Sequence, residues 1–268
     1  MASFRIRPGS KVRLRRYDPG DTSAFPGSKA RAIDATRRQV ARLDRLQELF
    51  YACRSSSLLV VLQGLDTAGK DGTIRRVFEG VDPQGVRVAS FKVPTPLEKD
   101  HDFLWRVHPH APAKGEIVIF NRSHYEDVLV ARVDRLVPKG VWRARFRAIN
   151  EFERMLTREG TTVVKFFLHI SEEEQRRRIA ARLADPTKHW KFSLDDAREQ
   201  PRYPLYTPAI EDVLTITSTE WAPWYLVPAD KKWFRDWVVS KVLIDTLEGL
   251  RQEWPPLPKG FRSNRIAR

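Results

Sequence analysis

The chain has little cysteine and no long apolar run, and each absence excludes a class of protein. Cys53 is the single cysteine in 268 residues, so no internal disulfide can form. The six histidines include no H-E-x-x-H pattern, and His108-Pro109-His110 has no cysteine or paired carboxylate nearby, which argues against a structural zinc site. No apolar segment approaches the ~20 residues that a membrane-spanning helix needs.

Positive charge, by contrast, is in excess. The sequence has 48 Lys and Arg residues against 34 Asp and Glu residues, a formal net charge of +14, within a globular composition of 41% hydrophobic residues. Such a charge predicts a partner that is a polyanion or a phosphate-bearing surface. Nucleic acid, an anionic membrane and a phosphate polymer all remain open at this level.

A glycine-rich segment, residues 64–70, follows the short apolar run from Leu58 to Leu62 and precedes a helical pattern. Its sequence is Gly-Leu-Asp-Thr-Ala-Gly-Lys. Glycines let backbone N–H groups close around an anion, and a helix N-terminus adds partial positive charge. Strand, glycines, lysine and helix together predict a phosphate-binding loop. The next residue is Asp71, where such loops usually carry a Ser or Thr whose hydroxyl meets Mg²⁺.

Apolar periodicity divides the chain into alternating helices and strands. Residues 1–28 are basic and turn-rich, which predicts an arm laid over the domain, with strand-like pieces and not a targeting helix in 1–16. Residues 29–268 show no internal repeat and no domain boundary, which predicts a single domain. The pattern predicts helices at 29–53, 71–80, 97–108, 141–159, 172–184, 209–220 and 230–250, and strands at 58–62, 86–93, 117–120, 162–170 and 223–227. Such alternation predicts a parallel sheet covered on both faces, with ligands at the carboxyl ends of the strands.

Charged side chains at the predicted strand ends are candidates for chemistry. Asp66, inside the phosphate-binding loop, could hold Mg²⁺ or accept a proton from the acceptor substrate, or it could only turn the backbone. Asn121 stands where phosphate-loop enzymes usually have a Mg²⁺-binding Asp, so metal binding would depend on Asp66, Glu126 or Asp127. Arg122 could hold a phosphate with its planar fork, unless this segment is a surface loop of mixed charge.

Two further segments could serve substrates. Residues 176–205 begin with Arg176-Arg177-Arg178 and Arg182, and a charge run of this kind is usually a solvated helix face. After a phosphate-binding loop, however, it predicts a basic lid that closes over the donor and neutralises charge during transfer. Residues 91–95 and Trp105-Arg106 could line an acceptor site or belong to the core.

These motifs resemble the polyphosphate kinase 2 family. Residues 64–72 and 120–128 look like its two signatures, and the resemblance continues at 102–106, 165–170, 189–192 and 222–230, so that it covers about 13–250. The resemblance implies a three-layer α/β/α phosphate-loop kinase fold similar to thymidylate kinase. It also implies reversible, Mg²⁺-dependent transfer of phosphoryl groups between inorganic polyphosphate and nucleoside mono- or diphosphates, with Mn²⁺ as an alternative ion. The segment 121–127 is similar to that of the subgroup accepting both AMP and ADP.

The resemblance also implies roles for individual residues. We expect Asp66, Lys70, Arg122 and Asp127 to be catalytic, with Asp66 and Asp127 nearest the metal. We expect phosphate or nucleotide binding by Gly64, Ala68, Gly69, Asp71, Gly72, Thr73, Lys92, Thr95, Arg106, Asn121, Glu126 and Arg132. The lid residues that match the family are Arg178, Arg182, Lys188 and Lys191. The chain departs from the family at Pro201, Pro204 and Pro208, because three prolines cannot share one unbroken helix.

The predicted function is therefore phosphoryl transfer from polyphosphate to AMP and ADP, giving ADP and ATP. Guanine nucleotides are further candidate substrates. We expect a cytoplasmic homo-oligomer, dimer or tetramer, with no nucleic-acid or membrane partner. An ATP-dependent nucleoside monophosphate kinase is the alternative enzyme. A nucleic-acid-binding phosphate-loop protein would fit the charge, but the sequence has no helix-turn-helix, RNP-like or zinc-finger motif.

Overall fold

The sheet of the protein is parallel throughout. In the computed structural model, which describes residues 1–191 and 202–257, five strands lie in the order β2-β3-β1-β4-β5. Their bounds are Ser57–Gln63 for β1, Val86–Ser90 for β2, Ile117–Asn121 for β3, Thr161–His169 for β4 and Trp224–Pro228 for β5. Because β1 pairs with β3 on one side and β4 on the other, the phosphate-binding loop leaves the sheet at its centre.

Strand β1 is apolar on both faces because helices cover both faces of the sheet. Leu59 and Val61 belong to one core cluster, whereas Leu58, Val60 and Leu62 belong to the other, and all five are fully buried. This alternation is what a two-residue side-chain period produces in a central parallel strand. The sequence-based prediction of a three-layer α/β/α fold is confirmed.

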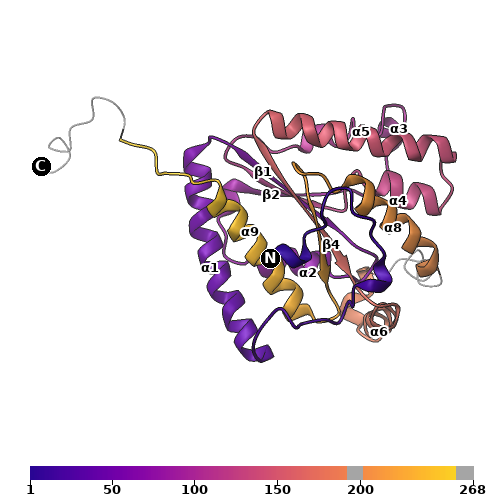
Figure 1. The fold of residues 1–268 in the computed structure, drawn as a ribbon, viewed down its shortest axis with the longest axis horizontal. Helices are drawn as coiled ribbons and strands as arrows, with labels where there is room; N and C mark the ends of the chain where they lie inside the picture. Colours follow the sequence, from indigo (N-terminus) through magenta and orange to yellow (C-terminus); the bar gives the residue numbers. More distant parts are fainter. Residues whose placement is uncertain (192–201, 258–268) are drawn as a thin grey trace, which may run out of the picture.

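The helices form two layers around the sheet (Figure 1). One layer packs on the cluster that contains Leu58 and comprises α1 (Lys29–Cys53), α2 (Lys70–Val77) and α9 (Lys232–Gly249). The other packs on the cluster that contains Leu59 and comprises α4 (Glu126–Val133), α5 (Lys139–Arg158) and α8 (Tyr203–Thr217). Helix α6 (Glu172–Leu183) follows β4. None of the described helices is both long and apolar enough to cross a bilayer.

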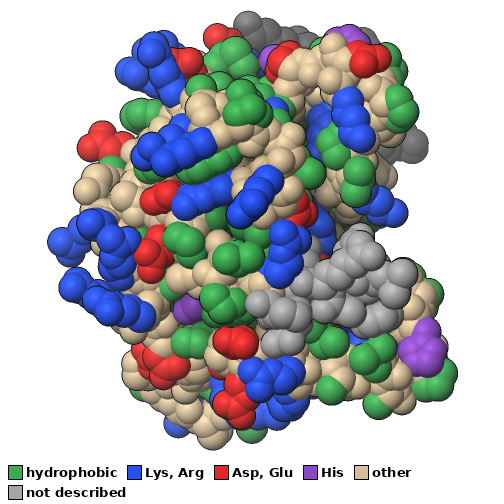
Figure 2. Space-filling model, turned by 90° about the vertical axis from the view of Figure 1, so that its right-hand side faces the viewer, with side chains coloured by type: hydrophobic (Ala, Val, Ile, Leu, Met, Phe, Trp, Pro, Cys, Tyr) green, Lys and Arg blue, Asp and Glu red, His purple; other side chains and the backbone are tan. Residues whose placement is uncertain are grey.

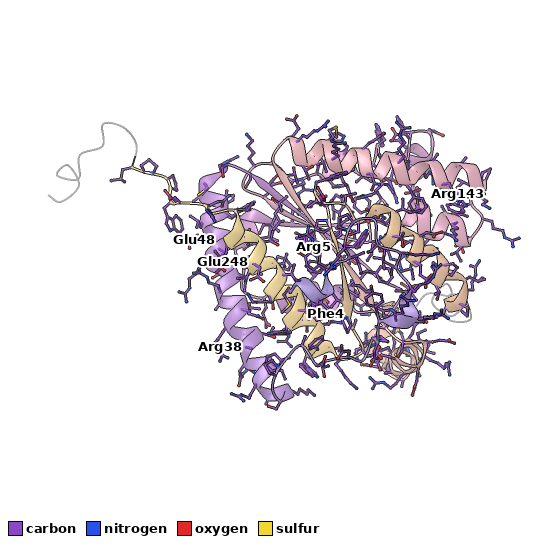
Figure 3. All side chains as sticks on the ribbon, viewed as in Figure 1. Phe4, Arg5, Arg38, Glu48, Arg143 and Glu248 are labelled. Atoms are coloured by element: carbon purple, nitrogen blue, oxygen red, sulfur yellow. The ribbon has the colours of Figure 1, made fainter. Side chains whose placement is uncertain are left out.

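The first residues of the chain lie against β5 and α9 (Figure 3). The Ile6 amide donates to the Trp224 carbonyl at 2.8 Å, and the ring of Phe4 lies edge-on to Phe234 with 6.0 Å between centroids. The predicted strand-like pieces are wrong, since Ala2–Phe4 and Leu14–Arg16 form 3₁₀ turns and one isolated bridge joins Arg5 to Tyr225. The chain turns away at Gly9, whose φ is +73°, before a ladder can form.

The predicted helix at 97–108 is also wrong. Helix α3 spans only Pro96–Lys99, and His108–His110 is a 3₁₀ turn. The Asp102 carboxylate accepts a hydrogen bond from the Leu104 amide at 2.9 Å, and such a local side-chain bond competes with helical pairing. Helix α4 was not predicted, and β2 ends at Ser90, three residues earlier than expected.

Helix α8 contains two of the three prolines that the sequence analysis singled out. Pro204 and Pro208 lie in one helix that begins at Tyr203, six residues before the predicted start at 209. Pro204 is in the first turn, where no intrahelical donor is required, and Pro208 removes one bond to the carbonyl one turn earlier. Pro201 and residues 192–201 of the predicted lid lie outside the described residues, and the preceding segment contains α6 and a 3₁₀ turn, Pro186–Lys191.

Candidate active site

The phosphate-binding loop joins β1 to α2 at the carboxyl edge of the sheet. Gly69 precedes α2 with a φ of +105°, and the Lys70 ammonium donates to the Gly64 carbonyl at 2.7 Å. A Cβ at Gly64 would lie 2.8 Å from the Leu168 carbonyl oxygen and 2.9 Å from the Ala68 Cβ. Both glycines are therefore dictated by backbone geometry and close approach. Thr73, in the first turn of α2, bonds through its hydroxyl to the Gly69 carbonyl at 3.1 Å, and Gly72 precedes it.

Helix α6 holds the carbonyl groups of the loop from outside. The Arg178 guanidinium donates to the Thr67 carbonyl at 2.9 Å and to the Ala68 carbonyl at 3.0 Å, and Gln175 donates to the Asp66 carbonyl at 3.4 Å. In a trans peptide the C=O and N–H point in opposite directions. Fixing these carbonyls toward α6 turns the N–H groups of the same peptides away from it, and of these the Ala68 N–H donates to the Leu65 carbonyl at 3.0 Å. Thr67 itself has a φ of +65°.

The end of β3 brings a cation to the loop. The Arg122 guanidinium lies 2.6 Å from the Asp66 carboxylate and 3.8 Å from the Glu126 carboxylate. These three side chains and Gly64 line a hollow whose apolar wall comes from Leu129, Val130, Phe167, Tyr206 and Ile210. A planar cation between two carboxylates, next to a phosphate-binding loop, can hold a phosphate and offset its charge.

The two unusual residues of the sequence motifs contact each other. The Asn121 amide donates to the Asp71 carboxylate at 2.8 Å. Asp71 replaces the usual hydroxyl after the loop lysine, and Asn121 replaces the usual carboxylate after β3. An amide–carboxylate hydrogen bond thus joins the positions that would otherwise share a metal ion.

Asp127 lies on α4 and faces α5. Its carboxylate accepts from Arg145 at 3.2 Å, and its second oxygen, Oδ2, is buried with no hydrogen-bond partner. Burial raises the pKa of Asp127 although the charges of Arg145 and Arg106 oppose the shift. The sequence analysis missed Arg145, because nothing in its spacing separates it from the exposed arginines on the same helix.

Other predicted site residues have contacts of their own. Arg132 pairs with Asp212 at 2.6 Å and lies over the Trp142 ring, while Arg106 is buried and donates to the Lys92 carbonyl at 2.8 Å. Thr95 caps α3, so its hydroxyl is used locally. In the predicted lid, Lys188 pairs with Asp185 and Arg182 is half-buried; the side chain of Lys191 lies outside what the structure describes.

A buried polar network lies beneath the site. The Lys165 ammonium on β4 donates to the Glu153 carboxylate at 2.5 Å and to the Tyr125 hydroxyl at 2.8 Å. The ring of His124 lies 3.2 Å from the same carboxylate. Because all four side chains are fully buried, the network fixes the segment between Asn121 and α4 against the neighbouring elements.

The residues present fit a divalent ion that substrate phosphates complete. Among the described residues, no group of three or more His, Cys, Asp or Glu is arranged to hold a metal alone. Mg²⁺ usually takes one or two carboxylates and fills its remaining positions with phosphates and water. Asp66 lines the hollow beside the loop, whereas Asp127, whose Oδ2 has no hydrogen-bond partner, does not line that hollow; both carboxylates are oxygen ligands of the kind such an ion prefers.

A central glycine loop with its lysine, on a five-stranded parallel sheet with an arginine and carboxylates at its carboxyl edge, defines the class as a phosphate-loop phosphotransferase. The model of the family described as Polyphosphate kinase 2 (PPK2) matches residues 27–255. The chain belongs to this family.

The comparisons extend over nearly the whole chain. It is 55% identical over 255 residues to the AMP/ADP-polyphosphate phosphotransferase of Meiothermus ruber, covering 95% of this chain and 96% of the relative. It is 43% identical to the ADP-polyphosphate phosphotransferase of Rhodopseudomonas palustris, covering 94% and 91%. The crystal structure of polyphosphate kinase 2 from Arthrobacter aurescens TC1 is similar with a TM-score of 0.91 and 43% identity, covering 97% and 92%.

Proposed function

We propose that this protein transfers phosphoryl groups from inorganic polyphosphate to AMP and to ADP, giving ADP and ATP in reversible reactions. The observation that carries the proposal is the meeting of the phosphate-binding loop with Arg122, Asp66 and Glu126 in a chain of the polyphosphate kinase 2 family. The names of relatives that the chain covers almost completely support the choice of acceptors.

The proposed mechanism uses position and charge. Phosphoryl transfer needs little covalent work from a protein, provided that donor and acceptor lie in line and the charge on the transferred group is offset. The loop N–H groups and Lys70 bind phosphate, and Arg122 orients and neutralises it. Asp66 orients Arg122 and is the nearest carboxylate to an acceptor phosphate held by that guanidinium.

A divalent metal ion is part of this proposal, with Mg²⁺ as the resident ion and Mn²⁺ as its substitute. Asp66 and Asp127 would hold it. When bound, the ion would supply positive charge that offsets the negative charge developing on the phosphoryl group during transfer. The hydrogen bond from Asn121 to Asp71 holds the end of β3 against the first turn of α2, next to the loop.

The net charge of +14 fits a donor that carries about one negative charge per phosphate. On the face drawn in Figure 2, lysine and arginine side chains lie in several groups interrupted by acidic ones. We propose that Arg182, in the last turn of α6, and Lys188, in the 3₁₀ turn that follows, contact polyphosphate as part of a lid over 176–205. We also propose that 1–28 is an arm on the single domain 29–268 and that the protein is cytoplasmic. Guanine acceptors and a dimer or tetramer stay predictions.

The test is direct. Purified protein receives polyphosphate and Mg²⁺ with either AMP or ADP, and no ATP is supplied. We expect ADP and then ATP from AMP, and ATP from ADP. If neither nucleotide is converted, the proposal is lost. Conversion of AMP or dTMP with ATP alone, in the absence of polyphosphate, would assign the protein to the ATP-dependent monophosphate kinases.

A further inference from the structure

Arg235 is a buried cation behind the phosphate-binding loop. It lies in the first turn of α9, is 2% exposed, and donates to its neighbour Asp236 at 2.9 and 2.7 Å. The same guanidinium reaches the Ala68 carbonyl at 3.4 Å. Helix α9 follows β5, so this contact joins a distant part of the chain to the centre of the site.

The guanidinium also occupies the space beside the loop glycines. A Cβ placed on Gly69 would lie 1.9 Å from Nη1 of Arg235, and a Cβ on Gly72 would lie 3.5 Å from Nη2. The arginine therefore lies directly against the backbone of the loop and of the first turn of α2. Gly69 is required for this packing as well as for its φ of +105°.

Stability alone is a weak reason for such a residue. A buried ion pair often contributes no more than well-packed apolar side chains of the same volume. Helix α9 is otherwise a buried apolar helix here, with Phe234, Val238 and Val239 beside the pair. The guanidinium differs from an apolar side chain in two ways: it donates to a loop carbonyl, and it adds fixed positive charge beside an anion-binding backbone.

We propose that Arg235 is a positioning residue that holds the phosphate-binding loop in its anion-binding form. Arg178 of α6 donates to the Thr67 and Ala68 carbonyls, and Arg235 of α9 donates to the Ala68 carbonyl and packs against Gly69. The loop therefore lies between α6 and α9, and each contact joins residues more than 100 positions apart in the sequence. The inference deepens the proposed function and rests on it for its kinetic readout.

The experiment compares Arg235→Gln and Arg235→Lys with Val242→Ala. Val242 is 1% exposed and lies two turns further along the same helix, within the apolar core, so its truncation lowers stability without touching the loop. Hydrogen–deuterium exchange of the peptide covering 64–72 reports the loop directly. Kinetics with polyphosphate and ADP report its function, and thermal unfolding provides the common stability scale.

We expect faster exchange at 64–72 in Arg235→Gln, together with a loss of roughly 10- to 100-fold in kcat/KM for polyphosphate. Arg235→Lys should recover part of both, because it keeps the charge but cannot contact Ala68 and Asp236 with one fork. Val242→Ala should change the exchange rate at 64–72 and kcat/KM by no more than twofold, even when it lowers Tm as much as Arg235→Gln does.

Two results would overturn the inference. One is exchange at 64–72 in Arg235→Gln equal to that of Val242→Ala. The other is an equal kcat/KM for polyphosphate in the two variants at the same folded fraction. In that case Arg235 would contribute to the stability of the fold and not to the loop. If the wild-type protein produces no nucleotide, the proposed function fails, and the exchange experiment still decides whether Arg235 holds the loop.

Discussion

The guanidinium of Arg122 lies 2.6 Å from the carboxylate of Asp66, so the end of β3 and the loop after β1 meet through an ion pair. Arg122 has a φ of +61°, a conformation that non-glycine residues adopt rarely and at a cost of about 1–3 kcal/mol. Its amide donates to the Leu62 carbonyl at 3.1 Å, which helps to hold that conformation. The strain directs a planar cation at the loop, where a phosphate would lie.

Replacing Arg122 with lysine tests whether the fork matters or only the charge. The lysine keeps a cation but cannot meet the Asp66 and Glu126 carboxylates together. We expect kcat/KM with polyphosphate and ADP to fall about 100-fold. Arg147→Lys, at an exposed ion pair with Glu151 on α5, is the matched control and should keep its rate. Equal rates in both variants would show that the fork of Arg122 has no role.

Asp66→Asn and Lys70→Ala should each abolish turnover while the fold survives. The first removes the carboxylate that orients Arg122, and the second removes the cation that caps the loop. We expect losses of about 10²–10³-fold in kcat or more. Circular dichroism and thermal unfolding check the fold. A variant that turns over like the wild type would refute the role assigned to its residue.

The phosphate-binding loop could be predicted from the sequence because its parts are contiguous. An apolar strand, two glycines and a lysine before a helix are local signals, and the strands β1 and β3 read as unbroken apolar runs. The prediction of a helix at 97–108 was wrong for an equally local reason, because the Asp102 carboxylate accepts a hydrogen bond from the Leu104 amide and so competes with helical pairing.

Residues that act through tertiary contact could not be found in this way. Arg145 and Arg235 approach the site from two different helices, and no spacing in the sequence shows which carboxylate or carbonyl each one meets. Arg178 was expected as a lid residue, but its contacts with the loop carbonyls could not be foreseen. One signal was available: the Arg235-Asp236 pair interrupts an apolar helical pattern. A charged pair inside a buried helix face needs a partner, and here the partner includes the loop.

Lys165→Met should be strongly destabilising. It leaves the Glu153 carboxylate fully buried without its ammonium partner, at a cost of about 3–5 kcal/mol in the free energy of unfolding. The double variant Lys165→Met, Glu153→Leu should recover most of this loss, because neither charge then remains. Urea unfolding measures both. A single variant as stable as the wild type would contradict the ion-pair account.

The same pair predicts a loss of stability at acid pH. Burial alone would raise the pKa of Glu153, but the charge of Lys165 and the hydrogen bonds from His124 and Lys165 together lower it. A carboxyl group whose pKa is lower in the folded protein stabilises the fold above its unfolded pKa. That contribution disappears as the pH falls through the folded value, and the double variant should lack this part of the acid transition.

Salt should weaken the use of polyphosphate more than the use of AMP. Each lysine or arginine that neutralises a phosphate releases a counterion, so the logarithm of KM for polyphosphate should rise steeply with the logarithm of salt concentration. Arg182→Gln and Lys188→Gln should each reduce that slope by about one if they contact the donor. Arg38→Gln, an exposed arginine on α1 (Figure 3), should leave the slope unchanged. If all three variants kept the wild-type slope, Arg182 and Lys188 would not contact the donor.

Asp127 separates stability from activity. Burial raises its pKa, against Arg145 and Arg106, so between its unfolded and folded pKa values the folded protein binds more protons than the unfolded chain. Its contribution to stability therefore falls as the pH rises from the unfolded toward the folded pKa. In metal-free protein, Asp127→Asn should unfold at the same or a higher temperature than the wild type at neutral pH, and this advantage should vanish at acid pH. Arg145 keeps its bond to the Asp127 backbone carbonyl in the variant.

The activity of Asp127→Asn should fall about 100-fold or more, because the amide is a poor ligand for a divalent ion. Glu151→Gln, on the surface, should change neither stability nor activity. A variant that unfolds earlier at neutral pH and keeps its activity would place Asp127 in the fold and outside the reaction.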